Sequence, residues 1–226
     1  MRSWSALLFL LLPGFAFAAE LPAYFSAALA QFTSDAPRGW AYTLTTTRGG
    51  ETSVERFDPS RPKGGEWTLL QRDGRAPTAE EIERYLRYKA SSTPPTARAT
   101  FEKGDLDRGS FTLLREDAAT AEFRGRFRED LKEPLLAHLV LDLKFTKQPA
   151  SVQAFTLRLA GPFSPAIGVK MTELEVTMEF SPPAEGRPSL PRASWSRFRG
   201  RLFFFKSIEE DLRIAYSDFV RVVPQR

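Results

Sequence analysis

Few residues in this chain could carry out chemistry. The sequence has 226 residues, no cysteine and one histidine, His138. The lack of cysteine excludes thiol catalysis, zinc–thiolate sites and iron–sulfur clusters. A nucleophile activated by His138 would need an orienting acid as well, and no G-x-S-x-G motif accompanies it. Because it lies where a predicted turn enters a strand and has no histidine companion for a metal, we expect His138 to be structural.

The carboxylates give only weak signals for a site. Calcium loops space their acids as D-x-D-x-D-G, whereas Glu102-Lys-Gly-Asp105-Leu-Asp107 has two of those acids and a misplaced glycine. Asp58 and Asp73 lie in predicted turns, where aspartate commonly binds backbone amides. A carboxylate pair of the glycosidase type forms only in space, so the sequence leaves it open. We predict no metal, no cofactor and no enzyme activity.

The first residues predict export. Arg2 is followed by the charge-free run Ala6-Leu-Leu-Phe-Leu-Leu-Leu12, a Pro13-Gly14 break and small residues at 16 and 18. This order is typical of a secretory signal peptide, and the run is shorter than the roughly 20 apolar residues that a membrane anchor needs. We therefore predict a signal over 1–18, cleaved after Ala18, and one periplasmic or secreted domain over 19–226, without a transmembrane segment.

The charge balance favours solubility over nucleic-acid binding. The chain has 32 Lys and Arg against 28 Asp and Glu, a formal net charge of +4. Charges of both signs are interspersed and no basic block of five or more occurs. A nucleic-acid site would gather its basic residues on one face or helix, so we predict no nucleic-acid partner.

Two segments have helical spacing. Residues 21–32 repeat apolar side chains at helical intervals and begin next to Pro22, which a first turn tolerates. Thr78-Ala-Glu-Glu81 is a capping box that begins a second helix, over 78–90. This helix carries Ile82, Tyr85, Leu86 and Lys89.

Elsewhere the apolar pattern has period two and predicts antiparallel strands. A hairpin is expected around Gly49-Gly50, and another around Gln148-Pro149. The clearest strands are expected at 40–45, 52–57, 67–70, 111–114, 121–128, 139–146, 154–160, 172–180, 195–205 and 212–222. Leu202-Phe-Phe-Phe205 would place aromatic rings on both faces of its strand, which indicates either cover on both sides or an exposed rim.

One face of this sheet should be charged. A strand with Glu173, Glu175 and Glu179 is followed by a strand with arginines at 197, 199 and 201. If the two strands pair, each charge meets an opposite charge across the ladder, worth roughly 0.2–1 kcal/mol a contact. We expect this solvated, paired arrangement; an anion or lipid-headgroup site is the alternative.

The expected fold is α+β and mainly antiparallel β: a strongly curved sheet or half-barrel of about nine to eleven strands with both helices on the apolar concave side. Two helices are too few to cover such a face, and a core that barely fills its concavity would be a hydrophobic-ligand site. An ordinary full core is the alternative. The predicted ligand-binding residues are Leu141, Leu143, Phe155, Leu157, Val176, Met178, Leu202 and Phe204.

The layout resembles a known family. The stretch from Phe57-Asp-Pro-Ser-Arg-Pro to Asp73-Gly-Arg-Ala-Pro-Thr-Ala-Glu-Glu81 is similar to uncharacterised exported bacterial proteins, and Tyr216-Ser-Asp-Phe219 resembles the last strand of the periplasmic lipoprotein carriers. LolA and LolB have that fold, as does the N-terminal domain of the regulators RseB and MucB. The resemblance implies a lipid or lipoprotein acyl chain as partner. With no lipobox cysteine, the chain is closer to LolA.

Two functions compete. The first is a soluble periplasmic protein that binds an acyl chain or lipoprotein in the curved sheet, and it rests on the sparsely covered apolar face. The second is an interaction or regulatory module of the cell envelope, whose exposed rim at Phe203 and Phe205 binds another protein.

Overall fold

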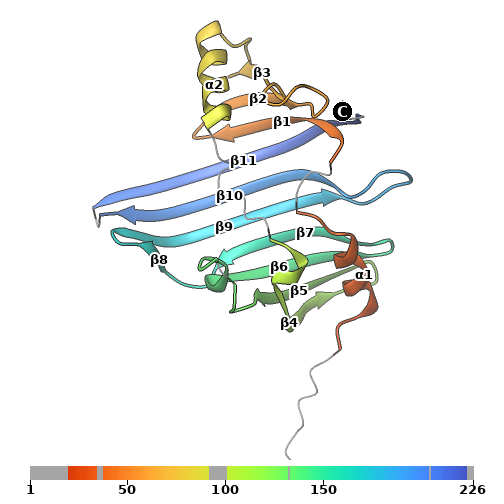
Figure 1. The fold of residues 1–226 in the computed structure, drawn as a ribbon. Helices are drawn as coiled ribbons and strands as arrows, with labels where there is room; N and C mark the ends of the chain where they lie inside the picture. The colour runs from red at the N-terminus through yellow and green to blue at the C-terminus, as the bar shows by residue number, and fades with distance from the viewer. Residues whose placement is uncertain (1–19, 35–37, 92–100, 132, 204, 223–226) are drawn as a thin grey trace, which may run out of the picture.

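The protein is built on one broad antiparallel sheet (Figure 1). The computed structural model describes residues 20–34, 38–91, 101–131, 133–203 and 205–222. Over these residues eleven strands form a single sheet in the order β3-β2-β1-β11-β10-β9-β7-β6-β5-β4, with β8 beside β9. The edge strands β3 and β4 do not pair with each other in this part of the chain, so the sheet is open. The predicted fold class is confirmed: mainly antiparallel β with two α-helices.

The N-terminal part of the chain supplies both α-helices and one edge of the sheet. Its elements are α1 (Ala23–Gln31), β1 (Trp40–Arg48), β2 (Glu51–Phe57), β3 (Trp67–Arg72) and α2 (Ala79–Ser91). The predicted hairpin around Gly49-Gly50 is confirmed. Both glycines have positive φ, +57° and +88°, a conformation that glycine adopts without a Cβ penalty.

The remaining strands come from the C-terminal part. In chain order the elements are the 3-10 helix η1 (Lys103–Asp105), β4 (Leu106–Glu116), β5 (Thr120–Phe127), the 3-10 helix η2 (Leu136–His138), β6 (Leu139–Lys147), β7 (Ala150–Leu159), β8 (Phe163–Ala166), β9 (Val169–Ser181), β10 (Leu190–Leu202) and β11 (Lys206–Arg221). The hairpin around Gln148-Pro149 is also confirmed. The last strand, β11, returns to pair with β1, so the N-terminal hairpin extends the sheet that the C-terminal part builds.

Both helices cover the same face of the sheet. Residues opposite each other in an antiparallel pair share a face, and the registers link one row across seven strands. That row is Leu143, Phe155, Met178, Ser194, Ile214, Thr46 and Ser53. The α1 side chain Phe25 packs on this face, against Phe145, and α2 contacts Glu55, two residues beyond Ser53. We call this side the apolar face and the other the charged face.

The core lies under α1. Phe25 is fully buried, and its ring lies 5.1 Å from those of Phe111 and Phe123 and 4.8 Å from that of Phe145. The contacts with Phe111 and Phe123 are edge-to-face, an arrangement that adds to the stabilisation from apolar burial. One helix of nine residues therefore fills the space over β5, β6 and β7.

The second helix is held differently. The predicted capping box is confirmed: the Glu81 amide donates to Thr78 Oγ1 at 3.2 Å, and the Thr78 amide donates to Glu81 Oε2 at 2.8 Å. Hydrogen bonds from Arg75 and from the Thr78 backbone lower the pKa of Glu81 to about 2. No residue of α2 is buried, so the helix lies on the sheet without entering the core.

Several predicted boundaries were wrong. The strand predicted to run to residue 205 ends at Leu202, and Phe203 and Phe205 belong to the turn into β11. The aromatic rings therefore do not alternate across a strand; they lie at its end. The short strand β8 was not predicted, because four residues are too few for an apolar period to emerge.

Among the described residues, no helix has the length and apolar character to cross a bilayer.

Candidate ligand-binding face

Four of the eight predicted ligand-binding residues form the packed core. Leu141, Leu143 and Leu157 have no exposed surface, and Phe155 keeps 2%. They belong to the same cluster as Phe25 of α1. A ligand could reach them only by displacing that helix, so the ordinary full core, the alternative to a pocket, describes this part of the face.

The other predicted residues lie at the edge of this core or beyond it. Val176 and Met178 of β9 are half-buried and pack against the core cluster, next to Leu157 and Phe155 of β7 in the register. Leu202, also half-buried, lies at the far end of β10, opposite Val169. Phe204 lies outside the described residues. The structure therefore does not bring all eight to one concavity, and ligand binding by them stays a prediction.

A half-buried apolar surface does exist between the helices. Its side chains come from the three longest strands, β9, β10 and β11, and all point to the apolar face. We call it the central strip: Leu174, Val176, Met178, Phe198, Ile208, Leu212 and Ile214. In contrast, the largest helix contacts are those of α1 with β7 and β6 and of α2 with β3. Figure 1 shows the three long strands crossing the molecule between the two helices.

Two serines run through the middle of the central strip. Ser194 lies between Met178 and Ile214 in the register, and Ser196 lies between Val176 and Leu212. Over Ser194 and Ser196 the surface along β10 is therefore lower than the apolar rows on its two sides, since a serine side chain is much smaller than theirs, and the large ring of Phe198 ends this low stretch. Both serines are half-buried. These serines could not be identified from the sequence, because their small size becomes informative only once the neighbouring strands are known.

The border of the central strip near α2 is polar. Tyr85 donates to Glu55 Oε2 at 3.0 Å, and Lys89 Nζ lies 2.8 Å from the same oxygen. Lys89 also lies 3.9 Å above the ring of Trp67, a cation–π contact. Burial and the neighbouring Glu55 carboxylate raise the pKa of Tyr85 above its usual value. Tyr85 therefore stays protonated as a donor, and three polar contacts rather than apolar packing anchor this helix.

The charged face is paired as expected. Glu173 lies opposite Arg199 and Glu175 opposite Arg197 in the register. Arg199 Nε lies 3.3 Å from Glu173, and Arg199 also binds Glu209. The predicted cross-strand neutralisation is thus confirmed for these strands. Glu179 is bound by Arg192 rather than by an arginine opposite it.

The residues considered for chemistry have structural contacts. The His138 ring stacks on Phe163 at 4.1 Å, and its backbone carbonyl accepts from Ala160. Asp58 accepts from the Ser60 amide at 3.0 Å, and Asp73 from the Thr52 amide at 2.7 Å. In the part of the chain that the structure describes, no group of three His, Cys, Asp or Glu residues could hold a metal ion.

The two aspartates of the segment that weakly resembles a calcium loop also accept hydrogen bonds from the backbone. Asp105 Oδ2 accepts from the Glu102 amide at 2.7 Å, which caps η1. Asp107 Oδ1 accepts from the Gly109 amide at 3.1 Å. These carboxylates bind backbone amides of their own segment.

Comparisons with protein-family models, with curated proteins and with solved structures found no match for this chain.

Proposed function

We propose that this protein binds an apolar chain, the acyl chain of a lipid or lipoprotein, on the central strip. One observation carries the proposal: seven large apolar side chains on the three longest strands stay half-buried while the helices cover the two flanks of the same face. Binding of a ligand to such a surface is favoured by roughly 25 cal/mol of free energy for each Å² of apolar area that it removes from water.

The shape of the strip supports an elongated ligand. The low stretch at Ser194 and Ser196, which ends at Phe198, has Met178 and Val176 on one side and Ile214 and Leu212 on the other. An acyl chain laid along this stretch would contact apolar side chains on both sides. Binding of this type requires no catalytic group, in keeping with the structural roles of His138 and the turn aspartates.

The proposal includes export of the protein from the cytoplasm. A signal peptide over 1–18 and a periplasmic or secreted location would place the protein where lipids and lipoproteins pass between membranes. The resemblance to the LolA-like carriers points to the same ligand class. Residues 1–19 lie outside the described part of the chain, so cleavage after Ala18 stays a prediction.

Native mass spectrometry tests the proposal on protein purified from its own compartment. We expect a bound mass that organic extraction releases as a lipid or fatty acid. Protein that is recovered free of lipid, and that gains none on incubation with a fatty acid, would refute it.

A second candidate is an envelope interaction module without a small ligand. Ile82 and Leu86 of α2 favour it, since they keep 39% and 44% of their surface exposed one helical turn apart. Apolar anchors at this spacing are typical of a helix that binds a protein groove. A partner captured by wild-type protein and lost on Ile82→Ser would support this function.

A further inference from the structure

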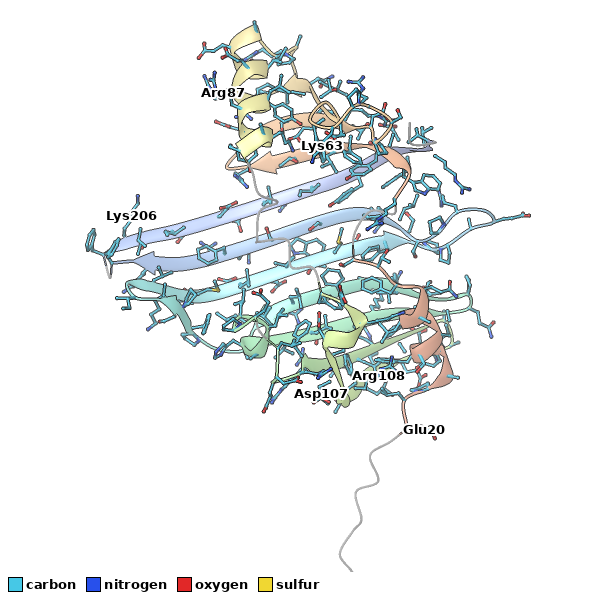
Figure 2. The ribbon with its side chains drawn as sticks, viewed as in Figure 1. Glu20, Lys63, Arg87, Asp107, Arg108 and Lys206 are labelled. Carbon is cyan, nitrogen blue, oxygen red and sulfur yellow. The ribbon has the colours of Figure 1, made fainter. Side chains whose placement is uncertain are left out.

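One end of the sheet carries the three most exposed large apolar side chains of the described residues. Ile167 is fully exposed, Phe205 is 84% exposed and Phe203 is 59% exposed. They lie in the β8–β9 turn and the β10–β11 turn, at the end of the long strands where Figure 2 labels Lys206. We call residues 166–170 and 201–207, Phe204 excepted, the sheet tip.

The two turns of the sheet tip are tied together. The Phe203 amide donates to the Gly168 carbonyl at 2.6 Å. Gly168 has φ +79°, and a Cβ added there would lie 2.9 Å from the Phe203 ring, so this ring lies directly over the glycine. The hydrogen bond and the ring contact therefore hold the two turns of the sheet tip in a defined arrangement.

Phe203 itself adopts a costly backbone conformation. Its φ is +48°, in the left-handed region that bulky residues rarely occupy and that glycine or asparagine enters more easily. Strain of this kind tends to be kept at binding and catalytic sites. A phenylalanine here gains little from burial, because most of its surface stays in water. An exposed apolar ring of this kind would be stabilised by contact with a partner molecule.

Basic side chains surround these apolar residues. Lys170 lies directly opposite Arg201 in the register, a like-charge pair that disfavours the ladder unless an anion lies nearby. Lys206 follows Phe205 in the chain. Among the described residues none of these three has an acidic partner, whereas the neighbouring Arg199 is bound by Glu173 and Glu209. Lys170 and Arg201 line an open hollow together with Thr172 and Ser207, and the ion pair of Arg199 with Glu209 lines it as well.

We propose that the sheet tip docks on a lipid bilayer that contains anionic headgroups. Ile167, Phe203 and Phe205 enter the interface, and Lys170, Arg201 and Lys206 meet the headgroup phosphates. Apolar residues beside Lys and Arg are the combination that interfacial binding requires. The charge match selects a lipid surface over a protein groove: three unpaired cations face outward at one end of the molecule, around apolar side chains that would otherwise remain in water.

This inference does not depend on the proposed function. The central strip and the sheet tip use different residues, so a protein that binds no acyl chain could still dock on a membrane. Substitutions in the tip should leave fatty-acid binding unchanged. Substitutions in the strip should leave vesicle binding unchanged.

Vesicle co-sedimentation tests the proposal with the full chain, purified in the form that the expressing cells produce. Vesicles of phosphatidylethanolamine with phosphatidylglycerol are compared with vesicles of phosphatidylcholine. One tip variant removes apolar surface, Ile167→Ser with Phe205→Ser, and a second removes charge, Arg201→Gln with Lys206→Gln. The matched controls are Leu113→Ser with Val220→Ser, whose wild-type side chains are 49% and 51% exposed, and Lys63→Gln with Arg108→Gln, which lie well away from Lys206 (Figure 2).

We expect binding to the anionic vesicles only, weakened at high salt because the charges are screened. Since each basic residue near an anionic surface contributes roughly fivefold to partitioning, the charge variant should lose at least about tenfold. The apolar variant should also lose about tenfold, because interfacial binding scales with the buried apolar area. Both control variants should bind like wild type, and all variants should keep the wild-type melting temperature.

Four results would overturn the proposal. They are no vesicle binding by wild type, equal losses in tip and control variants, equal binding to neutral vesicles, and a tip-dependent dimer in sedimentation that forms without lipid. The last result would assign the sheet tip to a second copy of the chain.

Discussion

Arg124 and Asp142 lie opposite each other on β5 and β6, and the arginine donates two hydrogen bonds to the carboxylate, at 2.7 Å from Nε and 2.9 Å from Nη2. Arg158 of β7 also binds this carboxylate. The Asp142 side chain is only 7% exposed. Burial alone would raise its pKa, but the two guanidinium groups outweigh burial and hold the pKa below its usual range. One buried carboxylate thus links three strands on the charged face.

Asp142→Asn should destabilise the fold by about 1–2 kcal/mol, because it leaves two arginines without their anion. A carboxylate with a lowered pKa adds stability above its unfolded pKa of about 4, and this contribution is lost as the pH falls through the folded value. The difference between wild type and variant should therefore shrink toward pH 2. Urea unfolding between pH 2 and pH 7 measures it.

Glu80→Gln is the matched control for Asp142→Asn. Glu80 pairs with Arg84 on the exposed surface of α2, and exposed pairs contribute little. Its effect should stay below about 0.5 kcal/mol. Equal stability of Asp142→Asn and wild type over the whole pH range would show that the three-strand link is not stabilising.

Thr78→Ala should loosen α2 without unfolding the sheet. The substitution removes the capping acceptor for the Glu81 amide, worth about 1 kcal/mol to a helix. Because no residue of α2 is buried, its opening can remain local. Hydrogen exchange should accelerate over residues 79–91 while the melting temperature stays close to that of wild type. A cooperative loss of protection across β1, β2 and β3 as well would show that the helix is part of the core.

His138→Gln should keep both the fold and the function. The His138 ring stacks on Phe163, a contact between two rings that needs no proton on the imidazole. The substitution should cost less than about 1 kcal/mol in stability and leave lipid retention unchanged. A folded His138→Gln protein without function would restore an enzymatic interpretation.

N-terminal sequencing of the exported protein should begin at Ala19. The prediction depends on the small residues at 16 and 18 after the Pro13-Gly14 break. A form that retains Met1 would contradict it.

The sequence predicted the elements and faces well, because period-two alternation records which side of a strand is buried. The alternation of Leu139, Leu141, Leu143 and Phe145 with polar residues placed all four on one face, and all four are buried there. The capping box at Thr78 and the glycine turn at 49–50 are local signals, and both were correct.

The arrangement of the strands was not predictable in the same way. Nothing in the local pattern indicates that β11 pairs with β1, and this pairing creates the central strip between the helices. Nor does amphipathic spacing show that α1 fills its half of the face while α2 rests on polar contacts. The predicted site was therefore divided: Leu141 and Phe155 lie in the core, and Val176 lies on the strip.

A fluorescent fatty-acid titration tests acyl-chain binding on the central strip most directly. Wild type should bind at micromolar strength, roughly −8 kcal/mol. Ser196→Trp and Val176→Trp should weaken binding at least about tenfold at an unchanged melting temperature. Ala215→Trp, on the exposed charged face of β11, should bind like wild type. The proposal would be contradicted if wild type bound no fatty acid, or if Ser196→Trp bound as well as wild type while Val176→Trp only lowered stability by the roughly 1–3 kcal/mol of an overpacked core.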